Sequence, residues 1–179
     1  MLAGIVDQGF NAIWVHGLLR GSVPSRVFPG LAPQAADHIR NMRELIARAA
    51  RHSIDVYVYL QPPRGLPVGD PFWTRHPDAG GRTYRVADPP EEIRCFCTSD
   101  ADVKAYVRDS TQRLFEELPG LAGLILISAS EYPAHCYSHY AVTRTPAEPL
   151  GCPRCEARHP TEVVSELIQL VRDGVRAVS

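Results

Sequence analysis

The sequence lacks the features that mark membrane-spanning, secreted and nucleic-acid-binding chains. Among its 179 residues, no apolar run approaches the roughly 20 residues that a membrane-spanning helix needs. The 19 lysines and arginines nearly balance the 20 aspartates and glutamates, so no basic surface for nucleic acid or anionic lipid is predicted. Because no signal peptide is visible either, we expect a cytoplasmic protein that binds neither nucleic acid nor membrane.

Two common catalytic motifs are also missing. The glycines at positions 21, 30 and 80–81 do not form a glycine-rich phosphate loop in front of a helix. No nucleophile-elbow pattern around a serine occurs. The sequence therefore predicts neither a phosphate-cradling loop nor a nucleophilic serine of the α/β-hydrolase type.

What is present is an alternation of short apolar segments with amphipathic ones. Strands are predicted over residues 11–17, 55–61 and 121–128, and helices over residues 2–8, 36–52, 99–118 and 160–178. Such alternation is typical of an α/β fold with a parallel sheet and crossover helices. Three strands alone leave both sheet edges open, which favours a piece of a larger α/β unit.

Two local features complete this prediction. Residues 64–98 hold many of the 16 prolines and show no periodicity, so a long irregular loop is expected there. Ser99 offers a helix cap, with Asp102 in the position of a capping box. We therefore expect the third helix to begin at Ser99.

The carboxyl ends of the predicted strands hold the candidate active residues, as is usual in parallel α/β folds. That rule selects His16, Gln61 and the segment that contains Ser130 and Glu131. Partial desolvation of Glu131 at the end of an apolar strand would raise the pKa of its carboxyl and suit a general acid. The alternative is a glutamate that faces solvent or pairs with an arginine.

Other candidates for substrate binding each have a structural alternative. His16 either contacts substrate or makes a structural hydrogen bond. Trp73, in the long loop, either stacks on a sugar or anchors the loop. Tyr57 and Tyr59 alternate with valines, and we expect them to serve packing.

Four residues that could bind a metal follow Glu131: Cys136, His139, Cys152 and Cys155. Their C-x2-H and C-x2-C spacings fit a tetrahedral structural zinc site. Free thiols or a disulfide are the alternatives. Cys95 and Cys97 stand too close together to chelate one metal from a regular strand, and free thiols are expected there. No cofactor is expected to be required for catalysis.

Three stretches of the chain carry a resemblance to a known family. They are an asparagine-led strand that ends in histidine and is followed by an Arg…Pro-x-Leu loop (9–16 and 26–31), a helix-to-strand passage (42–56), and a passage that ends in Ser130-Glu131 (97–131). Together they resemble the catalytic barrel of glycoside hydrolase family 20, the β-N-acetylhexosaminidases. In that family the last of these passages ends in an Asp-Glu pair.

The resemblance implies a (β/α)8 barrel and the hydrolysis of O-glycosidic bonds. The chain would form one partial barrel domain over residues 1–179, with about strands two to four and a Cys/His loop at 132–159. The remainder of the barrel is expected from further sequence, and this piece alone is expected to be inactive. Glu131 would be the general acid toward a glycan substrate. Ser130 stands where the family has an aspartate that supports the substrate's acetamido group, and a neutral hydroxyl does not supply that charge.

Two other functions fit the same residues. The first is a non-catalytic carbohydrate-binding or structural barrel. In it Ser130 would reflect the loss of catalytic chemistry, and zinc would hold the Cys/His loop. A catalytic metal would need an open coordination position near Glu131, whereas four soft ligands favour a closed site.

Overall fold

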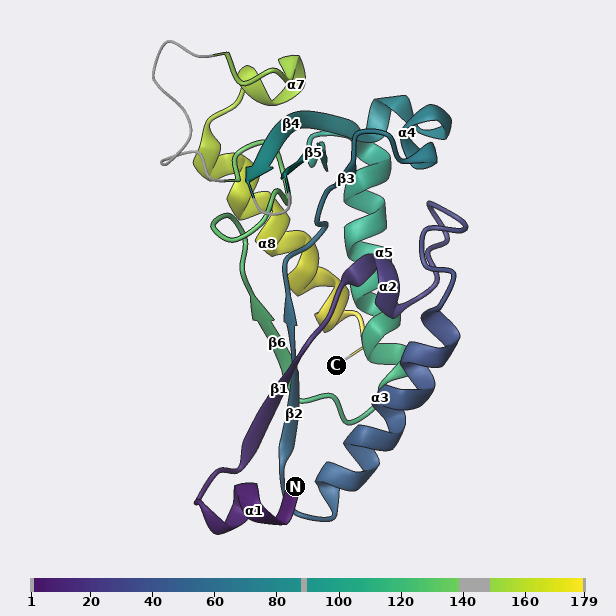
Figure 1. Cartoon of the computed structure of the whole chain (residues 1–179), viewed down its shortest axis with the longest axis vertical. Coiled ribbons are helices and arrows are strands. Elements are labelled where there is room, and N and C mark those ends of the chain that lie inside the picture. The colour runs from purple at the N-terminus through teal and green to yellow at the C-terminus, as the bar shows by residue number, and fades with distance from the viewer. Residues whose placement is uncertain (1, 88–89, 139–148, 179) are drawn as a thin grey trace.

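Two small sheets organise the chain, which we describe from a computed structural model covering residues 2–87, 90–138 and 149–178. One is a parallel sheet of three strands, and the other is an antiparallel sheet of three strands (Figure 1). The predicted α/β class is confirmed, and the antiparallel sheet is an addition that the sequence did not indicate.

The parallel sheet has its second strand in the middle. Strand β2 (Asp55–Leu60) pairs with β1 (Ala12–His16) on one side and with β6 (Gly123–Leu126) on the other. All three predicted strands are confirmed, with slightly shorter bounds. Their carboxyl ends meet at one edge of the sheet, because the strands run parallel.

Helices pack on one face of this sheet (Figure 1). Apolar side chains such as Val56, Val58 and Leu60 are buried in a common core with the helices. The long helices are α3 (Ala35–Ala50), α5 (Ala101–Glu117) and α8 (Pro160–Arg176). The three long helices predicted from the sequence are therefore confirmed.

The opposite face of the parallel sheet carries aromatic and polar side chains. Trp14, Tyr57 and Gly123 form one row across the strands, and His16, Tyr59 and Ile125 form the next. Trp14 is 58% exposed and Ile125 is 38% exposed. Within the part of the chain that the structure describes, this face therefore has no covering layer.

The remaining helices are short. They are α1 (Leu2–Asp7), α2 (Leu19–Ser22), α4 (Pro71–Arg75), a 3-10 turn (Pro77–Ala79) and α7 (Pro153–Glu156). None of the helices in the described ranges is both long enough and apolar enough to cross a membrane.

The antiparallel sheet occupies the stretch for which an irregular loop was predicted. Strand β5 (Pro90–Phe96) pairs with β3 (Leu66–Pro67) and with β4 (Gly80–Ala87). The prediction was wrong because β5 does not alternate: its first three residues are exposed, while Cys95 and Phe96 are both buried. Pairing with β4 and burial against the loop after β6, rather than sequence periodicity, stabilise this strand.

The N-cap of helix α5 (Ala101–Glu117) lies one residue later than the sequence suggests. Asp100, not Ser99, is the N-cap, and its Oδ1 accepts hydrogen bonds of 3.1 Å from the backbone N–H groups of Asp102 and Val103. The Ser99 hydroxyl instead lies 3.3 Å from the Cys155 sulfur. Ser99 thus lies beside the cysteine cluster and does not cap the helix.

Asp100→Ala should lower the free energy of unfolding by about 1 kcal/mol, because two N–H groups lose their acceptor. Asp100 also pairs with Arg154 at 3.0 Å, and the alanine variant loses this ion pair as well. Asp100→Asn keeps an acceptor oxygen and should retain most of the stability. Urea unfolding of both variants is the measurement, and equal losses would contradict a capping role.

Candidate functional site

The carboxyl edge of the parallel sheet brings Glu131 together with two residues of β2 and its continuation. The hydroxyl of Tyr59 and the side-chain amide of Gln61 both donate hydrogen bonds to Oε2 of Glu131, the latter at 2.5 Å. Arg64 donates to Oε1 of Gln61 at 3.0 Å, which orients the Gln61 amide with its nitrogen toward Glu131. Glu131 is thus held in place by donors from a neighbouring strand.

His16 lies in the same row of the sheet as Tyr59. Their ring centroids are 5.5 Å apart, and the Trp14 ring lies 5.1 Å from Tyr59 on the same face. His16, Gln61 and Glu131 therefore gather at one edge, as the strand-end rule predicts. Tyr59 belongs to this site although packing alone was expected of it.

Glu131 and Ser130 are both exposed. The partial desolvation expected for Glu131 is wrong for the described chain, because no described layer covers this face of the sheet. The hydrogen bond to the Glu131 carboxylate raises the pKa of Tyr59. Tyr59 therefore remains a neutral donor.

Trp73 does not lie at this edge. It belongs to α4, is 6% exposed, and its indole Nε1 donates to the carbonyl of Pro67 at 2.9 Å. Its ring packs against Phe72 and Phe96. The substrate-binding alternative for Trp73 is corrected in favour of the loop anchor, because its ring faces are buried by neighbouring aromatic rings.

A buried histidine supports the loop that carries Glu131. The His135 Nε2 lies 2.5 Å from the carbonyl oxygen of Ser128, and its Nδ1 accepts from the backbone N–H of Tyr137 at 3.1 Å. Burial lowers the pKa of His135 to about 4, so the ring is neutral and carries its proton on Nε2. His135 thus connects Ser128 to Tyr137 within the loop that carries Glu131.

A second constellation lies beyond this loop. The sulfurs of four buried cysteines all lie within 4.8 Å of one another: Cys97, Cys136, Cys152 and Cys155. Cys97 Sγ is 3.6 Å from the sulfurs of both Cys152 and Cys155. Hydrogen bonds lower the pKa of the Cys97 thiol to about 7, chiefly the one with Cys136.

Three of these cysteines are the predicted metal ligands, and Cys97 is an addition. His139, the fourth predicted ligand, lies outside the described residues. Cys97 was missed because its proximity to α7 depends on the β4–β5 hairpin, which the sequence did not indicate. Cys95 also lies beside the cluster, with its sulfur 3.8 Å from that of Cys136, but it is not one of the four mutually close sulfurs.

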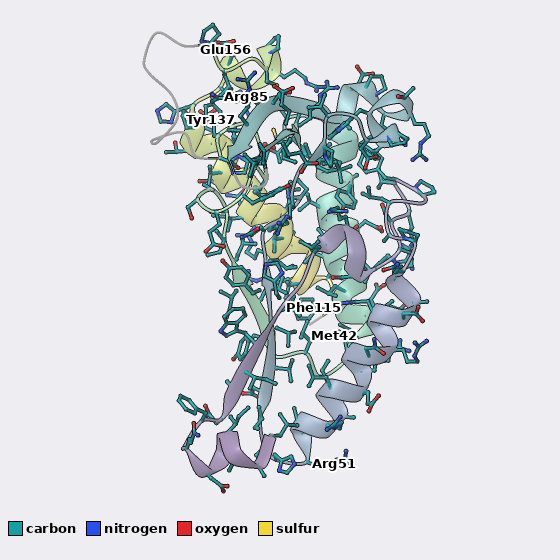
Figure 2. The ribbon with its side chains drawn as sticks, viewed as in Figure 1. Met42, Arg51, Arg85, Phe115, Tyr137 and Glu156 are labelled. Carbon is teal, nitrogen blue, oxygen red and sulfur yellow. The ribbon has the colours of Figure 1, made fainter. Side chains whose placement is uncertain are left out.

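Two tyrosines hold the backbone around the sulfurs. The Tyr84 hydroxyl donates to the carbonyl of Cys136 at 2.7 Å, and the Tyr137 hydroxyl donates to that of Cys155 at 2.7 Å. Figure 2 shows Tyr137 and Glu156 at the end of the molecule where β4 and α7 lie. The cluster is therefore a buried, braced region where the hairpin, the loop after β6 and α7 meet.

Comparison with solved structures finds distant structural similarity. No family model matches the chain, and no curated protein matches it. The chain is similar to part of an alpha-galactosidase from Lactobacillus brevis, with a TM-score of 0.48 and 11% sequence identity. The match covers 99% of this chain and 21% of that one, so the chain spans about a fifth of its length. This similarity assigns the chain to no family.

Proposed function

We propose that the chain is part of a (β/α)8-barrel glycoside hydrolase in which Glu131 is the general acid. The observation that carries this proposal is the carboxyl group of Glu131 at the carboxyl edge of a parallel sheet, anchored through Oε2 by Tyr59 and Gln61. Proton donors need fixed positions, because proton transfer depends on a hydrogen-bonding distance to the reacting oxygen.

In the proposed reaction Glu131 donates its proton to the glycosidic oxygen of a glycan. Both anchoring hydrogen bonds end on Oε2, so Oε1 is the atom proposed to carry the proton. The bond between the anomeric carbon and that oxygen breaks, and the leaving group departs as an alcohol. Water then supplies the new hydroxyl at the anomeric carbon, with a second carboxylate as base or nucleophile.

The uncovered face of the parallel sheet supports the larger barrel. In such barrels the strands close on themselves and the helices lie outside. The described sheet has helices on one face only, while the other presents the exposed Trp14 and Ile125. We propose that further strands close this face and supply the second carboxylate.

His16, Gln61 and Ser130 are the proposed substrate contacts at this edge. His16 and Ser130 are exposed beside Glu131 and can hydrogen-bond sugar hydroxyls. Gln61 is 6% exposed and acts mainly by holding Glu131. No metal takes part in the proposed proton transfer, and the zinc predicted from the sequence is proposed as a structural ion.

The second candidate function is glycan binding without turnover. The presence of a serine at position 130 in place of a second carboxylate favours it, because the described edge then carries one acid only. Exposed aromatic rings such as Trp14 suit the apolar faces of sugars.

Turnover and binding by the complete protein separate the two functions. Release of the aryl group from a panel of chromogenic glycosides measures hydrolysis, and calorimetric titration with the matching unmodified sugars measures binding. Hydrolysis of at least one glycoside is expected. Saturable sugar binding without any release of the aryl group would contradict the proposed hydrolase and favour the binding function.

A further inference from the structure

We propose that four buried cysteines bind one zinc ion as a closed structural site: Cys97, Cys136, Cys152 and Cys155. A tetrahedral zinc ion with Zn–S distances of about 2.3 Å places its sulfurs about 3.8 Å apart. The four sulfurs lie within 4.8 Å of one another, and Cys97 is 3.6 Å from two of them. The cluster therefore already has close to the dimensions of a four-thiolate zinc shell.

The sulfurs come from three separate parts of the chain. Cys97 follows β5, Cys136 lies in the loop after β6, and Cys152 and Cys155 flank the start of α7. All five cysteines of the chain are described, and none forms a disulfide, which would need an S–S distance of about 2.05 Å. Free thiols pack well as small apolar groups, but that gives four of them no reason to converge on one point.

Hydrogen-bond donors point at the sulfurs. The backbone N–H of Ser99 donates to the Cys97 sulfur, and the Ser99 hydroxyl lies 3.3 Å from the sulfur of Cys155. In the Cys152-Pro153-Arg154-Cys155 turn, the N–H of Cys155 donates to the carbonyl of Cys152 at 3.1 Å and closes the turn, so the donors at the sulfurs are those of Ser99. Such donors stabilise the thiolate form that binds a metal, in the way that outer partners support metal ligands.

Two arginines lie beside the cluster, and each also pairs with a carboxylate, Arg154 with Asp100 and Arg158 with Glu166. Zinc with four thiolates carries a net charge of about −2, which a buried site must balance. Arg154 is attracted electrostatically to Cys97 and Cys152, and it is held in position by the carbonyl of Gly80 at 3.1 Å. Arg158 adds a second cation near Cys155 and is fixed by Glu166 at 2.8 Å.

The backbone of β4 leaves room for the sulfurs. A Cβ atom on Gly81 would lie 2.4 Å from the Cys136 sulfur and 3.0 Å from that of Cys95. Only a glycine lets the strand approach this closely. Because four protein sulfurs fill a tetrahedral shell, the site has no open position and its role is structural. It joins the β4–β5 hairpin, the loop that follows Glu131 and α7.

Metal analysis of the purified chain tests the ligand set. The wild type should contain about one zinc ion per chain. Cys97→Ser should lose it, with a loss of affinity larger than the roughly 10- to 100-fold cost of removing an outer partner. Cys95→Ser is the matched control, being an equally buried cysteine two residues away, and should keep the zinc. His139→Ala should keep it as well.

Should Cys97→Ser fail to fold, cobalt substitution of the wild type identifies the metal ligands without any mutation. Tetrahedral Co²⁺ bound by four thiolates shows charge-transfer absorption that grows with each sulfur ligand, so the wild type should give a four-thiolate spectrum. A wild type that takes up neither zinc nor cobalt would overturn the proposal. So would a spectrum of three sulfurs and one nitrogen, or zinc lost from His139→Ala and kept by Cys97→Ser. None of these measurements depends on glycosidase activity.

Discussion

Glu131→Gln should reduce glycoside hydrolysis by the complete protein by about 1,000-fold, within the range that general acid catalysis contributes. The substitution is nearly isosteric, and the new amide oxygen can still accept from Tyr59 and Gln61. The protein should therefore stay folded with its edge site in place. What it loses is the proton that the leaving-group oxygen needs.

The leaving group distinguishes proton donation from other roles of Glu131. Aryl glycosides with acidic phenols leave readily without a proton, so the loss of kcat should shrink for them and be greatest for alkyl leaving groups. Glu91→Gln, another exposed glutamate but on β5, is the matched control and should keep full activity. An equal loss for every leaving group would contradict the acid role, and unchanged turnover would contradict any catalytic role.

Gly174→Ala should destabilise the fold by about 2 kcal/mol or more, the scale of an overpacked core position. Gly174 lies where α8 crosses α5, and a Cβ there would be 2.7 Å from the carbonyl oxygen of Arg108 and 2.8 Å from Thr111 Cβ. These atoms belong to the backbone and the base of a side chain, so a rotamer change cannot relieve the contact. The two helices would have to move apart, which opens the core around Leu167.

Gly4→Ala is the matched control for this prediction. Gly4 is also helical, but a Cβ there meets nothing within 4 Å, so the variant should gain up to about 1 kcal/mol from the higher helix propensity of alanine. Thermal and urea unfolding measure both variants. A Gly174→Ala chain as stable as the wild type would show that α5 and α8 do not pack as closely as described.

The local sequence pattern predicted the larger elements well. The spacing of Ile39 and Met42 predicts α3, and both are buried in the core. The run of β-formers at 55–61 predicts β2, whose Val56, Val58 and Leu60 face the helices. These elements could be predicted because each carries its own periodic apolar face, which is a local property of the chain.

The candidate site was predicted only in part. Position at a strand end is enough to select His16, Gln61 and Glu131, because parallel strands share one carboxyl edge. The role of Tyr59 was missed because the alternation of residue types along a strand predicts which face a side chain occupies but does not identify its hydrogen-bond partner. Cys97 was missed because its contact with Cys155 joins residues 58 positions apart.

By itself, the sequence determined the α/β alternation, the carboxyl edge that holds Glu131 and three of the four clustered cysteines. Only the tertiary structure decided that the proline-rich stretch forms an antiparallel sheet, that Trp73 is a buried anchor, and that Cys97 completes the cluster. The physical reason is the same in each case. Periodicity and strand order are encoded in neighbouring residues, whereas hairpin pairing, aromatic burial and sulfur convergence depend on contacts between segments that are distant in the chain.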